Sequence, residues 1–146
     1  MKKIAVFLFE GAELFEIASF TDVFGWNNVV GLKEFRDIKL ETISYKESIK
    51  CTWGGKIKVE KVIIEENIGN FFDYDILIIP GGFGKANFFE GKNNEIFKKL
   101  IKYFSESNKI IVAICSAVIN LLESGYIKNK KVTTYLLDNK RYFNQL

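Results

Sequence analysis

Three short apolar runs, at residues 3–9, 75–79 and 109–114, constrain the fold of this chain more than any other feature. They are rich in residues that favour β-structure and show little alternation with polar residues, which is typical of strands covered on both faces. Segments with helical spacing follow each run. Strands that alternate with helices predict parallel crossover connections. We therefore expect an α/β fold with a doubly wound, mostly parallel sheet and helices on both faces.

Three helices are expected between the strands. Apolar residues recur at helical spacing from Leu14 to Phe24, and Gly25 predicts the end of this first helix. Asn93 or Asn94 can cap a second helix, whose apolar face comprises Ile96, Phe97, Leu100, Ile101 and Phe104. A third helix, residues 116–122, is apolar almost all round and is expected to end at Gly125.

Shorter elements complete the expected fold. Residues 37–45 alternate between apolar and charged positions, which favours a strand nearer the edge of the sheet. Residues 53–55, Trp-Gly-Gly, are a turn signal between short β segments within residues 51–59. Residues 132–135 predict a short strand, and the remaining residues predict a helix that is still running at Leu146.

Length and charge narrow the class of protein. A chain of 146 residues suits one domain, which we expect to span residues 1–146. The net charge is +3 with acidic and basic residues interleaved, so nucleic-acid binding is not indicated. No apolar stretch approaches the roughly 20 residues that cross a bilayer, and the N-terminus lacks a signal-peptide cleavage site. Two distant cysteines argue against a disulfide framework and favour a cytoplasmic protein.

The chain contains no histidine. Histidine is the commonest general base and the commonest metal ligand in proteins, and every triad that uses an imidazole requires it. We expect neither a metal site nor a cofactor. Any catalysis must use other side chains.

Three segments with unusual residues leave strand ends: residues 10–16, 80–84 and 115–116. Ligands of open parallel sheets bind beyond the carboxyl ends of the strands. If the three preceding strands are neighbours in the sheet, all three segments meet at one edge. Their convergence predicts a small-molecule pocket there.

Cys115 stands directly between a predicted strand and a predicted helix, which leaves no room for a loop. We expect it on a sharp turn like a nucleophile elbow. Its sulfur would face the free N–H groups and the positive dipole end of the helix, which favour thiolate over thiol. The alternative is a buried structural cysteine, and position alone leaves both interpretations open.

The other two segments are equally open to interpretation. Glu16 lies one turn into the first helix, where the helix dipole also favours a solvated acidic residue, and Glu13 competes for any functional role. Residues 80–84, Pro-Gly-Gly-Phe-Gly, complete neither a P-loop nor a dinucleotide fingerprint. They form either a plain tight turn or a backbone that offers N–H groups to an oxyanion.

Three other residues are interpreted as structural. Cys51 and Trp53 flank the expected turn of the β segments. Tyr135 closes the predicted strand after Thr133 and Thr134, so it could reach the same sheet edge, although a core aromatic is the favoured interpretation.

Four motifs carry a resemblance to a known family: residues 11–16 (Gly-Ala-Glu-Leu-Phe-Glu), 80–82 (Pro-Gly-Gly), 113–116 (Ala-Ile-Cys-Ser) and 131–134 (Lys-Val-Thr-Thr). In this order, over essentially the whole length, they resemble the DJ-1/PfpI superfamily. Its members have the class I glutamine-amidotransferase-like fold, a flavodoxin-like arrangement. Four motifs together are far more specific than any one of them.

The resemblance implies roles for individual residues. Cys115 matches the elbow cysteine, and Glu16 matches the acidic residue that hydrogen-bonds it as a protonated acid beside a thiolate. Gly82 and Ser116 match the backbone N–H positions of an oxyanion site. Further candidates for the pocket lining are Gly81, Glu13 and Tyr135.

The chain departs from the family pattern in two ways. Many members place a histidine after the Thr-Thr pair, where Tyr135 and Leu136 stand here, so a Cys–His mechanism is unavailable within one chain. What remains resembles branches that use a cysteine and a carboxylate, such as the isocyanide hydratases. Members also usually continue for another strand and helix. The chain is therefore either incomplete at its C-terminus or covered by a partner there, and the resemblance implies a homodimer.

We expect an enzyme that acts on small electrophilic carbonyl compounds. The Cys115 thiolate would add to an electrophilic carbon while Glu16 transfers the proton, as in glyoxalase-, deglycase- or hydratase-type reactions. One alternative is a redox-responsive or chaperone-like stress protein in which Cys115 is oxidised. Another is a ligand-binding regulatory module. A peptidase or amidase role is the least favoured, because no histidine is available as a base.

Overall fold

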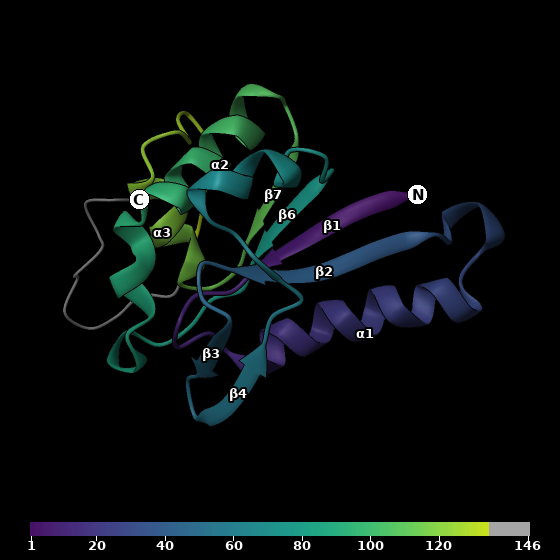
Figure 1. The fold of residues 1–146 in the computed structure, drawn as a ribbon, viewed down its shortest axis with the longest axis horizontal. Coiled ribbons are helices and arrows are strands. Elements are labelled where there is room, and N and C mark those ends of the chain that lie inside the picture. The colour runs from purple at the N-terminus through teal and green to yellow at the C-terminus, as the bar shows by residue number, and fades with distance from the viewer. Residues whose placement is uncertain (135–146) are drawn as a thin grey trace.

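A five-stranded parallel sheet forms the centre of the protein, whose computed structural model describes residues 1–134 (Figure 1). The strands are β1 (Lys2–Phe7), β2 (Ile38–Ser44), β5 (Lys61–Val62), β6 (Ile76–Ile79) and β7 (Ile110–Ala113). Their order is β5-β2-β1-β6-β7, and every pairing is parallel. The expected α/β fold with a doubly wound, mostly parallel sheet is confirmed.

Helices cover both faces of this sheet. Helix α1 (Leu14–Val30) lies against one face, and α2 (Glu95–Glu106) and α3 (Ala117–Glu123) lie against the other (Figure 1). Successive strand residues point to opposite faces. In β1, Val6 therefore packs with Ile17 of α1, while the ring of Phe7 lies 5.1 Å from that of Phe97 in α2. Burial on both faces explains why the apolar run of β1 does not alternate.

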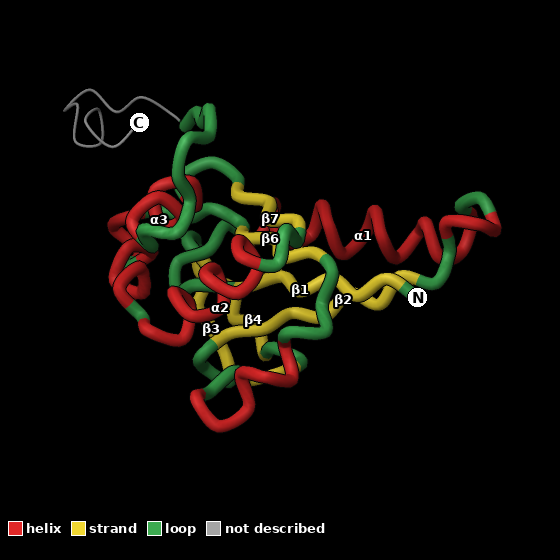
Figure 2. Tube along the Cα trace, turned by 90° about the horizontal axis from the view of Figure 1, so that it is seen from above, coloured by secondary structure: helices red, strands yellow, loops and turns green. Residues whose placement is uncertain are grey.

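Smaller elements connect these layers. Strands β3 (Ser48–Cys51) and β4 (Gly54–Lys58) form the expected antiparallel hairpin. Its turn lies at Thr52 and Trp53, and Gly54, with φ +125°, begins β4. Four 3₁₀ helices lie at Lys33–Phe35, Glu65–Phe71, Gly84–Ala86 and Phe88–Asn93. Figure 2 shows α1 extending beyond the body of the molecule, with the 3₁₀ helix Lys33–Phe35 at its far end.

The capping of two helices agrees with expectation. The Asn94 side chain accepts hydrogen bonds from the N–H groups of Ile96 and Phe97, which fixes the start of α2. Helix α3 ends at Glu123, and Gly125 follows in the left-handed region with φ +80°. Glycine adopts that conformation at little cost, which explains why Gly125 predicted the end of this helix.

The predicted end of α1 at Gly25 is wrong, because the helix continues to Val30. Contacts at its last turns hold it. Asn28 donates from Nδ2 to the Ile38 carbonyl and accepts from the Ile38 N–H, and Asn27 donates to the Phe35 carbonyl. These bonds tie the helix to the start of β2 and to the 3₁₀ helix before it, and they offset the intrinsic cost of a helical glycine.

Two expectations near the C-terminus also need correction. Strand β7 was expected to be buried, but it lies at the sheet edge within residues 1–134, and Ile110 is 57% exposed. A groove of about 620 Å³ runs beside it, lined in part by Ile111, Val118 and Leu121. Residues 132–134 form no strand. Tyr135 and the helix expected after it lie outside the described residues.

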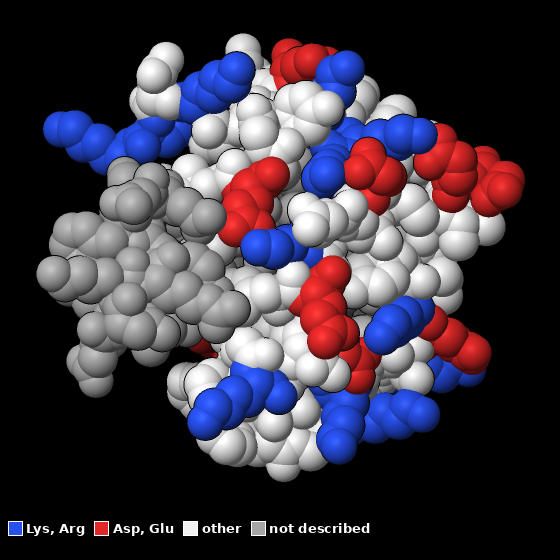
Figure 3. All heavy atoms as spheres, turned by 90° about the vertical axis from the view of Figure 1, so that its left-hand side faces the viewer, with Lys and Arg blue, Asp and Glu red and all other residues white. Residues whose placement is uncertain are grey.

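Charges on the described surface are mixed. Figure 3 shows acidic and basic side chains interspersed over one face instead of gathered by sign. Ion pairs such as Lys92–Glu123 (2.7 Å) and Lys58–Glu47 (3.2 Å) contribute to this pattern. Among the described helices, none combines the length and the apolar character that a membrane span needs. Residues 1–134 hold no group of three or more His, Cys, Asp or Glu side chains that could bind a metal ion.

Candidate active site

The segments that leave β1, β6 and β7 meet at one edge of the sheet, as their positions predicted. The Glu13 N–H donates to the Gly81 carbonyl at 2.8 Å, and Ala12 forms an isolated β-bridge with Gly82. Strand β6 lies between β1 and β7, so its Pro80–Gly82 extension is placed between the other two segments. The carboxyl ends of these strands therefore form one continuous site.

Cys115 occupies a strained turn between β7 and α3. Its φ is +52°, in the left-handed region that non-glycine residues rarely adopt. The turn is held by the Ala117 N–H, which donates to the Ile114 carbonyl, and by the Thr134 hydroxyl, which donates to the Cys115 carbonyl at 2.8 Å. Strained backbone at an exposed cysteine is the geometry of a nucleophile elbow.

Glu16 reaches this turn through Gly81. The Gly81 N–H donates to Glu16 Oε2 at 2.6 Å. A Cβ atom on Gly81 would lie 2.8 Å from the Cβ of Cys115 and 3.0 Å from Glu16 Oε2. Cys115 and the Glu16 carboxylate therefore border the same small space, which only a glycine at position 81 leaves open.

The electrostatics of Cys115 differ from the low-pKa thiol that its place before a helix predicted. Partial burial of the sulfur raises the pKa of the Cys115 thiol, and the negative charges of Glu16 and Glu13 raise it further. The neighbouring polar groups of Ser116 act in the opposite direction without overcoming these effects. The nearby Glu16 carboxylate therefore opposes ionisation of the Cys115 thiol.

Ser116 makes contacts that the sequence analysis missed. Its buried hydroxyl accepts a hydrogen bond from the Gly82 N–H at 2.9 Å and donates to the Gly82 carbonyl at 2.7 Å. The Gly82 N–H, expected as an oxyanion donor, is therefore already paired within the chain. The hydroxyl residue directly after the elbow cysteine was the one sequence signal that could have predicted these two hydrogen bonds.

The remaining candidate residues are distributed as follows. Glu13 precedes α1 as its N-cap residue, without a side-chain capping bond, and its charge raises the pKa of both cysteines. Cys51 is buried and free, in agreement with a structural role. Trp53 is 82% exposed and stacks on Phe83, so it does not belong to the core. Tyr135 lies outside the described residues.

Fold and contacts together define an α/β protein with an elbow cysteine at the carboxyl edge of a parallel sheet. A sequence profile described as the DJ-1/PfpI family matches residues 2–144, and the chain belongs to this family.

Individual relatives support the assignment. An uncharacterized protein of Methanocaldococcus jannaschii is 32% identical over 123 residues, which cover 73% of this chain and 57% of that protein. Protein DJ-1 homolog B of Arabidopsis thaliana is 33% identical over 90 residues, covering 60% of this chain and 20% of that protein. The chain thus spans little more than half, or less, of these relatives. The crystal structure of Drosophila melanogaster DJ-1beta superposes with a TM-score of 0.76 at 23% identity, covering 99% of this chain and 69% of that chain, which shows a shared fold.

Proposed function

We propose that this protein is an enzyme acting on small electrophilic carbonyl compounds, with Cys115 as nucleophile and Glu16 as proton donor and acceptor. The observation that carries the proposal is the space at Gly81. The Glu16 carboxylate and the Cys115 side chain both border it, and each lies within about 3 Å of one point there. This proximity supports a proton transfer between the Cys115 thiol and the Glu16 carboxylate, directly or through one water.

The proposed reaction begins with transfer of the thiol proton of Cys115 to Glu16. The thiolate then adds to the carbonyl carbon, which forms a C–S bond and moves the π electron pair to oxygen. Glu16 returns the proton to this oxygen and gives a hemithioacetal. With methylglyoxal, a proton then moves from the carbon bonded to sulfur to the neighbouring carbonyl carbon, with no net oxidation or reduction, which gives a thioester. Water hydrolyses this thioester, which breaks the C–S bond, releases lactate and regenerates the Cys115 thiol. The Ser116 N–H, which acts to lower the pKa of the Cys115 thiol, is the backbone group that would donate to the developing oxyanion. The Gly82 N–H joins it only if the Ser116 hydroxyl turns away.

Methylglyoxal consumption is the test of this proposal. We expect turnover to fall to background in Cys115→Ser and to fall by about 10²-fold or more in Glu16→Gln, because general acid–base groups contribute about that much. Cys51→Ala is the matched control, since Cys51 is the other free cysteine. Turnover that is unchanged in Cys115→Ser would exclude the proposal.

A second candidate function, oxidation of Cys115 as a redox response, is favoured by the difference in exposure between the two cysteines. Cys115 is exposed whereas Cys51 is buried. Mass spectrometry after mild peroxide treatment should then find sulfenic or sulfinic acid at Cys115 alone. Equal oxidation of both thiols would count against a sensing role.

A cytoplasmic homodimer completes the proposal. The outer face of α1 leaves several large apolar side chains in solvent, including Phe15 at 84% and Val30 at 70% exposure, together with Val23 and Trp26. Apolar surface of this extent on a soluble protein usually belongs to an interface. Sedimentation analysis should find a dimer that Trp26→Asp dissociates. A wild-type monomer at micromolar concentration would refute this part.

A further inference from the structure

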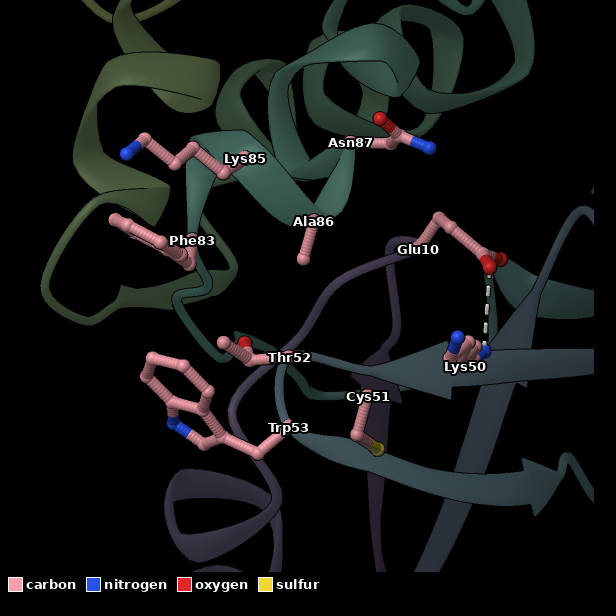
Figure 4. A pocket seen from close by; sticks show the side chains of 9 residues that line it. All are labelled: Glu10, Lys50, Cys51, Thr52, Trp53, Phe83, Lys85, Ala86 and Asn87. Atoms are coloured by element: carbon pink, nitrogen blue, oxygen red, sulfur yellow. Dashed lines mark hydrogen bonds between the residues drawn. The ribbon is translucent and has the colours of Figure 1, made fainter.

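A second hollow lies beside the candidate active site. It has a volume of about 430 Å³, between the β3–β4 hairpin and the segment that follows Gly82 (Figure 4). Its lining comprises Glu10, Lys50, Cys51, Thr52, Trp53, Phe83, Lys85, Ala86 and Asn87. Neither Cys115 nor Glu16 belongs to this lining, and the volume lies within the usual range for small-molecule sites.

Backbone contacts hold the walls of this hollow in place. The Thr52 hydroxyl and the Phe83 N–H both donate to the Gly11 carbonyl, at 2.7 and 3.2 Å. The Thr52 N–H donates to the Ala12 carbonyl at 3.0 Å. Gly11 has φ +74°, and a Cβ there would lie 2.2 Å from the Ala86 carbonyl oxygen. The two walls therefore meet in a close backbone approach and form the hollow before any ligand binds.

One side of the hollow is aromatic. The rings of Trp53 and Phe83 stack with centroids 5.8 Å apart and planes 27° from parallel, and both lie at the same side of the cavity in Figure 4. The Trp53 side chain remains largely in solvent despite this contact. An indole held on a neighbouring ring but open to solvent offers a surface on which a planar group can stack.

The polar groups around the hollow favour an anion. Within residues 1–134, neither the Lys50 nor the Lys85 ammonium has an ion-pair or hydrogen-bond partner. Glu10 is the one acidic residue of the lining, and it already accepts from the Lys46 ammonium at 3.3 Å and the Lys50 N–H at 3.4 Å. A neighbouring hollow of about 680 Å³ shares Glu10 and Lys50 and adds Lys46 and Lys56. The lysine ammonium groups around the two hollows therefore outnumber the one carboxylate, which is already paired with Lys46.

We propose that this hollow binds a small anion that carries a planar group. The planar group stacks against Trp53 and Phe83, and the anionic group bonds the Lys50 ammonium on the opposite side. Lys85, which extends alongside Phe83 in Figure 4, adds attraction at the rim. This binding requires no reaction at Cys115, so it stands independently of the proposed enzymatic function.

Titration calorimetry at low salt, with benzoate as the probe, tests the proposal. Cyclohexanecarboxylate keeps the charge but lacks the planar ring, and benzyl alcohol keeps the ring but lacks the charge. Lys50→Gln and Trp53→Leu alter the site. Lys33→Gln and Phe35→Leu are matched controls, because Lys33 and Phe35 are exposed residues that do not line the hollow.

We expect saturable benzoate binding that Lys50→Gln and Trp53→Leu each weaken by about tenfold or more, as loss of a charge-assisted bond or of a stacking contact should. The two control variants and Cys115→Ala should bind benzoate as the wild type does, and both comparison compounds should bind more weakly. Absence of saturable binding, or equal affinity in Lys50→Gln, would overturn the proposal. Loss of binding in Cys115→Ala would overturn it too, because the hollow would then not be an independent site.

Discussion

Gly81→Ala tests the geometry on which the candidate active site depends. The added Cβ would lie 2.8 Å from both the Cys115 Cβ and the Ile114 carbonyl oxygen, and 3.0 Å from Glu16 Oε2. Two of these neighbours belong to a strained turn that cannot recede freely. Overpacking of this kind costs about 1–3 kcal/mol of folding free energy. Displacement of Glu16 would also break its 2.6 Å bond from the Gly81 N–H, worth about 1.5–3 kcal/mol for a charged acceptor.

Urea denaturation measures the expected loss, with Gly69→Ala as the matched control. A Cβ on Gly69 has no neighbour within 4 Å, and the backbone there is not left-handed. Alanine at such a position should leave stability unchanged or raise it by about 0.4–1 kcal/mol. Gly81→Ala should therefore lower the free energy of unfolding, whereas Gly69→Ala should leave it unchanged or raise it.

A double-mutant cycle with Glu16→Ala separates the two contributions. If displacement of the carboxylate is part of the cost, Gly81→Ala should destabilise the Glu16→Ala background less than the wild type, by about 0.5 kcal/mol or more. Equal stability of Gly81→Ala and Gly69→Ala would refute the close approach itself. Strict additivity in the cycle would refute the coupling of Gly81 to Glu16.

Three further predictions follow from the contacts of the site and the sheet. Ser116→Ala leaves the buried N–H and carbonyl of Gly82 without their partner, so the free energy of unfolding, measured by urea denaturation, should fall by about 2–4 kcal/mol. A loss below about 0.5 kcal/mol would contradict a stabilising role for these two hydrogen bonds. Glu16→Gln removes a negative charge that raises the pKa of the Cys115 thiol, so the pH midpoint of its alkylation by iodoacetamide should move lower, and an unchanged midpoint would argue against their proximity. Burial acts to raise the pKa of Glu41, but hydrogen bonds from a tyrosine and two lysines outweigh it and hold this pKa below 4.5. A carboxyl group whose pKa is lowered by folding stabilises the protein at pH values above its unfolded pKa, and this stabilisation is lost as the pH falls through the folded pKa. The Glu41→Gln variant should therefore lose less stability than the wild type on acidification below about pH 4.5.

Some features of this protein depend on short-range sequence signals, and these were predictable. The unbroken apolar run of β1 indicates a strand buried on both faces, because each of its residues must pack on one face or the other. Asn94 caps α2 through N–H groups two and three residues away. The meeting of Glu13, Gly81 and Cys115 at one edge followed from the rule that parallel strands present their carboxyl ends together.

Other features appear only when distant segments come together. The Gly81 N–H and Glu16 Oε2 are 65 positions apart in the chain, and Ser116 and Gly82 are 34 apart, so no local pattern specifies either bond. The raised pKa of Cys115 depends on partial burial of its sulfur and on the carboxylates of Glu16 in α1 and of Glu13 just before that helix. The sequence by itself determined the order of strands and helices and the residue types at the site, because periodicity and caps act over a few positions. Only the tertiary structure decided which backbone donors are free and how the thiol titrates, because both depend on desolvation and on contacts across the sheet.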